Sequence, residues 1–399
     1  AGASGIAQPI SGPGSGLLME DIQIRCCKEA DIEGVRLLLD TYWRRGHILA
    51  RDEAFFRWQF DTDRCRDQIF EGPSVLLATN RDQIVGMLGL SYFDLNITGS
   101  SVPGVWMSHL LAIPEMRQQG LGGRLLQMVR DLGYEVIFGL GINEIVKQIY
   151  SHRGYEILQE MPRVIGVFDL NRTTALLQES NSEKSGDSLR QFATDYLIAG
   201  AEASSNSDVE IIEWVDSFGA GWDSLWTDRL APNLVCPGKD SAFLNWRYTN
   251  HPAYKYEMRL ARHAATGKVL GLTAFRIETV KDRSDKVLRV VEFLSTPEAE
   301  HALAHSIVRF GHQLQVSFAD FLCTSRKVAR ALELVGFRRE VAPEAGMGFP
   351  SLFQPLEPGH LKLGGSFWLS DNLRAELPAL LSLDDFYIVK SDSDQDRPI

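Results

Sequence analysis

The sequence predicts an α/β protein with two similar domains in tandem, and three observations support this prediction. The chain has 399 residues, which is more than one ordinary domain contains. Strand-like and helix-like hydrophobic patterns alternate through the first half. Three short segments of that half then recur in the same order further along.

The first predicted domain covers residues 20–170. Its hydrophobic spacing predicts helices at 30–43, 121–132 and 143–152 and strands at 74–79, 84–92, 104–113 and 136–140. Residues 1–18 are rich in Gly, Ser and Ala and carry no charge until Glu20. We expect them to be an expression remnant or a disordered lead, outside the fold.

The second predicted domain covers residues 209–345 and looks like a degenerate copy of the first. Arg51–Phe60 aligns without gaps on Lys239–Tyr248, and two later matches follow in the same order, Ile84–Gly86 with Val269–Gly271 and Arg153–Tyr155 with Val335–Phe337. A polar stretch at 171–208 predicts a linker, partly helical and partly flexible. Residues 346–399 form a C-terminal tail.

Composition excludes several classes of partner. The formal net charge of −11 disfavours nucleic acid and anionic membrane surfaces, which need a basic face. No apolar run is long enough to cross a bilayer. The five cysteines are odd in number and show no zinc-like spacing, which indicates a reducing cytoplasm. We expect a cytoplasmic monomer or homodimer.

A glycine-rich turn between a predicted strand and helix is the first candidate site. Arg117–Gly122 reads R-x-x-G-x-G. A helix start offers unpaired N–H groups and the positive end of the helix dipole, and Gly120 and Gly122 let a pyrophosphate approach the backbone. Similar turns occur in dinucleotide folds, and a tight helix start without a ligand is the alternative.

A second motif follows at a fixed spacing. Asn143 and Tyr150 lie about two helical turns apart on one face, and Gly154-Tyr155 comes next. With the R-x-x-G-x-G turn, this pattern resembles the GNAT superfamily of acyl-CoA-dependent N-acyltransferases. The resemblance implies, for each half, a mixed and mostly antiparallel central sheet flanked by helices. It also implies acetyl-CoA or another short acyl-CoA as co-substrate.

The resemblance assigns roles to particular residues. Gln118–Arg124 would wrap the CoA pyrophosphate, Asn143 would hold the pantetheine arm or sulfur, and Tyr150 would protonate the leaving thiolate. A backbone N–H around Leu111 would hold the thioester oxyanion. The alternative for Tyr150 is a ring that only packs on the sheet. The predicted acyl-CoA site comprises Leu111, Ala112, Ile113, Arg117, Gln118, Gln119, Gly120, Leu121, Gly122, Gly123, Arg124 and Asn143.

The base that deprotonates the attacking amine is less certain from the sequence. Many family members carry a Glu on the strand at 106–111, and this chain has only His109 there as a titratable residue. Simple alternation places His109 on the same face as Met107 and Leu111. His109 is thus the candidate base, with a structural or substrate-binding histidine, or water as the proton acceptor, as alternatives.

The second half lacks the residues of the predicted acyl-CoA site. Residues 293–313 contain no R-x-x-G-x-G, and Leu332 stands where Tyr150 stands in the first copy. We therefore expect a single acyl-CoA site in the chain. The second half would form one wall of the acceptor site and determine which acceptor binds.

The acceptor is predicted from weaker signals. Tandem GNAT enzymes that act on nucleotide-linked amino sugars resemble this chain in the segment Phe243–Tyr248 and in the acidic finish at 391–396. Trp58 and Trp246 would stack a base or sugar, or else be core aromatics. Asp392, Asp394 and Asp396 would receive an ammonium or hydroxyls, or else belong to a solvated terminus. We therefore expect the tail at 346–399 to pack near the acceptor site.

Other functions stay open at this point. The acceptor could be another small amine, such as an amino acid, a thiol-cofactor precursor or an antibiotic. A non-catalytic acyl-CoA sensor is a further alternative, which a retained proton donor disfavours. His301, His305 and His312 have helical spacing but no carboxylate or cysteine to complete a site, so we expect no metal.

Overall fold

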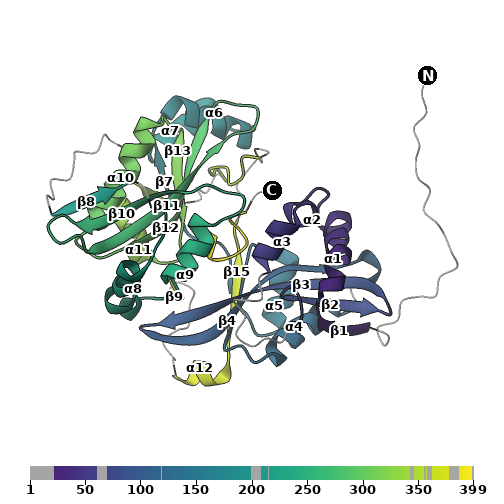
Figure 1. The fold of residues 1–399 in the computed structure, drawn as a ribbon. Helices are drawn as coiled ribbons and strands as arrows, with labels where there is room; N and C mark the ends of the chain where they lie inside the picture. Colours follow the sequence, from purple (N-terminus) through teal and green to yellow (C-terminus); the bar gives the residue numbers. More distant parts are fainter. Residues whose placement is uncertain are drawn as a thin grey trace.

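The computed structural model describes residues 22–60, 70–117, 119–198, 208–213, 215–341, 346–354, 356, 362–376 and 386–397. The predicted lead at 1–18 lies outside these ranges. The chain forms two lobes, each built on one sheet with helices on its faces (Figure 1). This confirms the predicted α/β class with two mixed, mostly antiparallel sheets.

The first sheet takes most of its strands from the N-terminal half, in the order β1-β2-β3-β4-β5-β15-β6. All neighbours are antiparallel except β4 and β5, which are parallel. A short strand, β9 (Val235–Pro237), adds to the end of β3. The bounds are β1 Ile22–Cys26, β2 Val75–Asn80, β3 Gln83–Ile97, β4 Ser100–Ala112, β5 Val136–Leu140, β6 Glu156–Leu158 and β15 Gly365–Leu369.

The second sheet repeats this topology. Its order is β8-β10-β11-β12-β13-β7-β14, again antiparallel except for one parallel pair, β12 with β13. When the two strand orders are aligned, each strand of the first sheet except β9 has a counterpart in the second. The bounds are β7 Arg163–Val167, β8 Val209–Ile212, β10 Glu257–His263, β11 Val269–Thr279, β12 Lys286–Ser295, β13 Phe318–Leu322 and β14 Arg338–Arg339.

The two halves exchange one strand each. Strand β7 follows the first half in sequence but pairs with β13 and β14 in the second sheet. Strand β15 comes from the C-terminal tail but lies between β5 and β6 of the first sheet, where Figure 1 shows it in yellow among blue strands. Each sheet therefore contains a strand from beyond the domain limits predicted at residues 170 and 346. Hydrophobic patterns within a segment carry no information on which distant strands pair.

Twelve α-helices in the described ranges cover the sheets. Helices α6 and α7 occupy much of the predicted linker at 171–208 and bury Leu177, Leu189 and Phe192 against β7. The bounds are α1 Ile32–Leu38, α2 Ile48–Arg51, α3 Glu53–Gln59, α4 Leu121–Asp131, α5 Glu144–His152, α6 Leu170–Ser180, α7 Gly186–Thr194, α8 Ala220–Leu225, α9 Ser241–Leu244, α10 Glu300–Gln313, α11 Arg326–Glu333 and α12 Asp371–Glu376.

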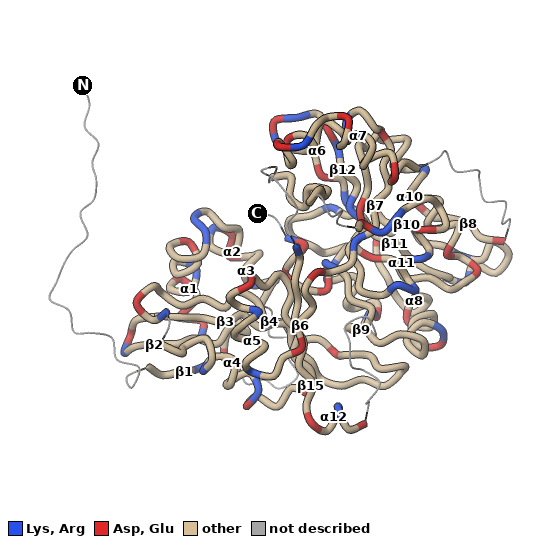
Figure 2. Tube along the Cα trace, turned by 180° about the vertical axis from the view of Figure 1, so that it is seen from behind, with Lys and Arg blue, Asp and Glu red and all other residues tan. Residues whose placement is uncertain are grey.

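Acidic and basic residues are both distributed along the whole described chain trace (Figure 2). Figure 2 shows acidic and basic positions interspersed along both lobes. Within the described ranges, none of the helices combines the length and the apolar character that crossing a bilayer requires.

Candidate active site

Strands β4 and β5 separate at the centre of the first sheet. Their parallel pairing runs from Gly104 with Val136 to Met107 with Gly139 and stops there, although β4 continues to Ala112. A β-bulge follows at once, in which two residues of β4 stand opposite Leu88 of β3. We call the unpaired side of β4 at 108–112 the open edge. A bulge bends its strand, so the bulge explains why β4 separates from β5 at this point.

The backbone amides of the open edge alternate in direction, so that only some of them point toward β3. The N–H of Ile113 donates to the carbonyl of Val85 at 3.0 Å. Since the hydrogen bonds of an antiparallel pair alternate, the N–H of Leu111 faces Met87, and the N–H of Ala112 turns toward the open edge. Of the amides around Leu111, that of Ala112 is therefore the one that points away from β3.

Helix α4 begins beside the open edge with an uncapped N-terminus. Its N-cap is Gly120, which has a left-handed backbone (φ +82°) and provides no side-chain hydrogen bond to the first turn. The first intrahelical bond joins the N–H of Arg124 to the carbonyl of Gly120 at 3.2 Å, so the amides of Leu121–Gly123 point outward from the helix start. Leu121, Leu125, Leu126 and Val129 bury the other face.

The cation nearest this helix start is Arg153, which sequence reasoning missed. Its guanidinium lies where a Cβ at Gly123 would be, directly over the first turn of α4. Arg124, by contrast, points to β1 and donates to the carbonyl of Ile22 at 2.9 Å. Arg117 donates to the carbonyl of Ala112 at 3.3 Å. Gln118 lies outside the described residues.

Tyr150 lies at the point where β4 and β5 separate. A Cβ built on Gly139 would be 3.3 Å from Cε2 of its ring, and Gly139 is the last residue of β5 that pairs with β4. The side chain is buried, and burial raises the pKa of the Tyr150 phenol above its ordinary value. The phenol therefore stays protonated near neutral pH, as a proton donor must. No described residue hydrogen-bonds to it.

A second hydroxyl meets Tyr150 at the same glycine. Oγ of Ser366 would lie 3.0 Å from the Cβ built on Gly139. It is buried and has no described hydrogen-bond partner. Ser366 belongs to β15, the strand exchanged from the tail, so no local pattern connects it with Tyr150.

Asn143 occupies the N-cap of α5. Its side-chain oxygen accepts from the N–H of Val146 at 3.0 Å. The residue is exposed at the end of β5 and is positioned by its own helix. Its local role is thus structural, and its predicted contact with pantetheine stays a prediction.

His109 lies inside the bulge of β4, with a left-handed φ of +53°. The predicted sharing of one face by Met107, His109 and Leu111 assumed unbroken alternation, which the bulge interrupts. The imidazole is buried against Trp43, and its Nδ1 lies 3.8 Å from the carboxylate of Asp394. Burial, and then the charge of Arg397, lower the pKa of His109 well below its ordinary value.

A cavity of about 670 Å³ lies between the halves on the far side of His109. Trp43 and His47 line it and also contact the His109 ring, with centroids 5.2 and 5.6 Å apart. Gln395 lines it too and packs over Gly141, just after β5. The cavity therefore reaches the open edge from the side opposite α4.

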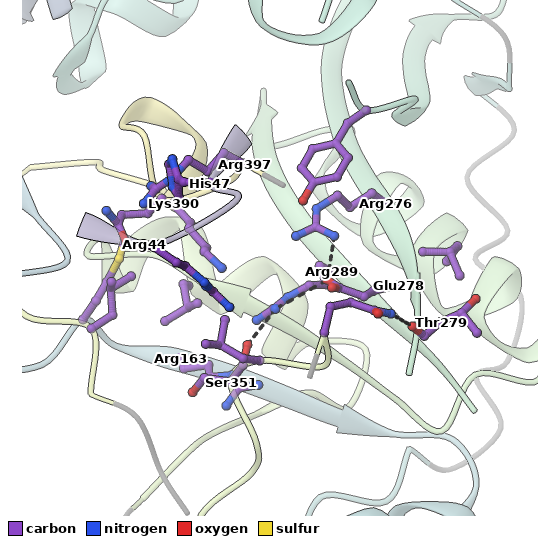
Figure 3. Close-up of a pocket in the computed structure, with 18 of the residues that line it drawn as sticks. Arg44, His47, Arg163, Arg276, Glu278, Thr279, Arg289, Ser351, Lys390 and Arg397 are labelled. Carbon is purple, nitrogen blue, oxygen red and sulfur yellow. Dashed lines mark hydrogen bonds and ion pairs between the residues drawn. The ribbon is translucent and has the colours of Figure 1, made fainter. Parts of the chain in front are cut away.

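The lining is basic although the chain is acidic. Seven lining residues are Lys or Arg and two are Glu. Figure 3 shows the basic side chains on facing walls of the cavity. Such a lining concentrates field lines and attracts anions. The basic members are Arg44, Arg163, Lys255, Arg276, Arg289, Lys390 and Arg397.

A buried carboxylate fixes part of this lining. Asp320 of β13 accepts from Arg163 of β7 at 2.6 Å and from Arg289 of β12 at 2.9 Å. Burial alone would raise the pKa of Asp320, but Arg289 and Arg163 overcome it and hold the pKa at about 2. Asp320 thus ties the exchanged strand β7 to the cavity wall.

We expect Asp320→Asn to lower the free energy of unfolding by about 3–5 kcal/mol, because it leaves two buried guanidinium groups without their shared anion. Urea denaturation measures this. The exposed pair Arg229–Glu298 supplies the control, since Glu298→Gln should cost at most about 1 kcal/mol. The Asp320 contribution is present above pH about 4 and is lost as the pH falls through about 2, since the folded pKa is the lower one. Equal costs for the two variants would contradict this role.

The residues predicted to bind the acceptor lie elsewhere or have partners. Trp58 and Trp246 stack on each other, with centroids 4.7 Å apart, and neither lines the cavity. Asp392 is buried in an ion pair with Lys239, away from the cavity lining. Asp394 pairs with Arg397 at 2.7 Å. The sequence identified these side chains as polar or aromatic but contained no sign of their partners.

The equivalent opening of the second sheet is filled by the chain itself. Pairing of β12 with β13 stops at Val290 with Phe321. Residues 387–391 enter there: the hydroxyl of Tyr387 accepts from the N–H of Phe293 at 3.1 Å, and the hydroxyl of Ser391 donates to the carbonyl of Val291 at 2.7 Å. Leu332, the counterpart of Tyr150, is buried.

Comparison with known proteins agrees with this geometry. Residues 37–155 match the model of the Acetyltransferase (GNAT) family. This range contains the bulge, the α4 turn and Tyr150. The N-terminal sheet domain is therefore a GNAT acetyltransferase domain. The enzyme class that this domain supports is an acyltransferase.

Solved structures with low sequence identity share the fold. A probable N-acyltransferase of Enterococcus faecalis V583 is 11% identical, with a TM-score of 0.52 over 87% of this chain and 72% of that one. A GCN5-related N-acetyltransferase of Anabaena variabilis ATCC 29413 is 10% identical, with a TM-score of 0.51 and the same coverage. No curated protein sequence matches significantly.

Proposed function

We propose that the protein transfers an acetyl or other short acyl group from CoA, by direct attack, to the amine of a nucleotide-linked amino sugar. The observation that carries this proposal is the open edge of β4. It has the uncapped start of α4 on one side, Tyr150 at its inner end and a basic cavity on the other side. Donor and acceptor can therefore approach one carbonyl from opposite sides.

The donor would bind along the open edge. The outward amides of Leu121–Gly123 and the guanidinium of Arg153 suit a pyrophosphate. The pantetheine amides can pair with β4 where β5 no longer does. The thioester then reaches Gly139, beside Tyr150 and Ser366.

The chemistry is a single displacement. The amine nitrogen bonds to the thioester carbonyl carbon, and the oxyanion that forms accepts a hydrogen bond from the N–H of Ala112. The C–S bond then breaks, and the thiolate takes the phenolic proton of Tyr150. The proton lost from the amine passes to a base on the cavity side.

His109 is the candidate for that base. It is neutral at neutral pH because its pKa is lowered, and it contacts the cavity wall through Trp43 and His47. We expect His109→Gln to lower kcat about tenfold or more. The wild-type pH–rate profile should show no rise near pH 6.5, the ordinary imidazole value. Steady-state rates from pH 5 to 9 measure both, and a variant with the full rate across this range would exclude His109 as base.

The acceptor class rests on the cavity. Its volume suits a small-molecule ligand, and its basic lining favours one that carries phosphate. Another small amine is the alternative acceptor, and a non-catalytic acyl-CoA sensor is the alternative function. Calorimetric titration with acetyl-CoA, followed by thiol-release assays with a panel of nucleotide-linked amino sugars and simple amines, tests all three. Release with simple amines alone would overturn the acceptor, and binding without release for any amine would support the sensor.

The tandem arrangement is part of the proposal. The two sheets share strand order, and Asp52 and Asp240, which the sequence aligns, both cap a helix by accepting from the amide three residues on. The aligned Trp58 and Trp246 stack on each other. These correspondences support a duplicated GNAT domain in which only the first copy keeps an acyl-CoA site.

A further inference from the structure

Four of the seven cations of the cavity form ion pairs with described carboxylates, and one of these pairs is Arg397 with Asp394. Arg163 and Arg289 share Asp320. Arg276 pairs with Asp396 at 2.9 Å and with Glu278 at 2.6 Å. These guanidinium groups shape the wall, but their charge is already largely compensated.

Two cations have no such partner. Among the described residues, no carboxylate lies within ion-pair distance of the Lys390 amine or the Arg44 guanidinium, and both residues line the cavity. They reach it from different elements, since Arg44 follows the helical turn at 39–43 and Lys390 begins the 3-10 turn Lys390–Asp392 of the tail. In Figure 3, Arg44, Lys390 and Arg397 lie on one wall and Arg276 on the facing wall.

The surroundings of Lys390 make its charge costly. Burial lowers the pKa of its amine to about 7, Arg289 and Arg276 lower it as well, and Asp396 and Asp320 oppose this. A cation held among other cations in a partly buried position needs an anion to balance it. The nearby carboxylates, Asp396 and Asp320, already form ion pairs with arginines.

We propose that Lys390 and Arg44, backed by Arg276 and Arg289, form an anion subsite that binds the phosphate groups of the acceptor. Arg44 offers a fork of donors that matches two phosphate oxygens, and Lys390 offers a point charge. The subsite orients the acceptor so that its amine faces His109 and the open edge. This inference rests on the proposed acyl transfer and adds to it the class of acceptor and the residues that select it.

Inorganic pyrophosphate is the probe that tests the subsite. It is titrated calorimetrically into the full chain with CoA present in excess, so that the α4 turn does not contribute. We expect Lys390→Gln and Arg44→Gln each to weaken pyrophosphate binding at least tenfold, and Lys390→Arg to restore most of it. Lys28→Gln removes the same charge near β1, outside the cavity lining, and should change the affinity less than twofold.

Kinetics separate this inference from the proposed function. With an active acceptor, Lys390→Gln should raise the KM for the acceptor at least tenfold and leave the KM for acetyl-CoA unchanged. Pyrophosphate binding that is equal in the wild type and in Lys390→Gln overturns the subsite. Absence of acetyl-CoA binding or of thiol release, with the pyrophosphate difference intact, would overturn the proposed function but leave the subsite standing.

Discussion

Tyr150→Phe is expected to lower kcat by about 100-fold or more, because the leaving thiolate loses its proton source. Affinity for acetyl-CoA should stay nearly unchanged, since the substitution removes one oxygen and keeps the ring against Gly139. The hydroxyl has no described hydrogen-bond partner, so the free energy of unfolding should also change little. Steady-state kinetics and calorimetric titration with acetyl-CoA measure the two effects separately.

Tyr155 provides the matched control. Its ring centroid lies 5.1 Å from that of Tyr150, and it is also buried. Tyr155→Phe removes an equivalent hydroxyl one ring further from the open edge, and turnover should stay within about twofold. A large loss of acetyl-CoA affinity in Tyr150→Phe would show instead that the hydroxyl serves binding or packing.

Gly120→Val is expected to weaken acetyl-CoA binding by about 100-fold or more. Gly120 has φ +82°, a conformation that a β-branched residue adopts only under strain, and a side chain there would project toward the phosphates. Apart from its chain neighbours and the backbone of α4, no described residue has an atom within 4 Å of the added Cβ, so the effect should fall on the ligand more than on the core. Calorimetric titration measures the affinity, and thermal unfolding checks that the fold is kept.

Gly133, at the other end of the same helix, provides a control that distinguishes backbone strain from loss of ligand contact. Its φ is +81°, and its Cβ position is equally open. Gly133→Val should cost a similar amount of stability, about 1–2 kcal/mol, and leave acetyl-CoA binding intact. If both variants bind acetyl-CoA like the wild type, the pyrophosphate does not lie at this turn.

Local features of the active site could be predicted from the sequence. The α4 turn follows from glycines between a strand and an amphipathic stretch, and the Asn143–Tyr150 spacing places both residues on one helix. Each of these two patterns lies within about a dozen consecutive residues, so it can be recognised without knowledge of long-range contacts. The repeat was also visible, because aligned segments such as Asp52–Phe55 and Asp240–Phe243 keep the same capping chemistry.

Features assembled from distant segments could not be predicted. Ser366 meets Tyr150 only because β15 joins the first sheet, and Arg44 and Lys390 line one cavity only because the tail folds back between the halves. For the acidic tail the sequence allowed substrate binding or a solvated terminus, but Asp392 and Asp396 are buried against Lys239 and Arg276. Pairing of buried charges depends on contacts that sequence spacing does not encode.

The strand exchange also has a consequence for biosynthesis. When β6 leaves the ribosome, its partner β15 lies about 200 residues from being translated, which at ordinary elongation rates means a delay of about 10–40 s. Until β15 is made, the backbone N–H and C=O groups of β5 and β6 that pair with it lack their partners. Such unpaired strand edges can pair with other chains. We therefore expect the nascent first half to aggregate more readily than the full chain. The site becomes complete only after β15 and the cavity-lining residues Lys390 and Arg397 have been translated.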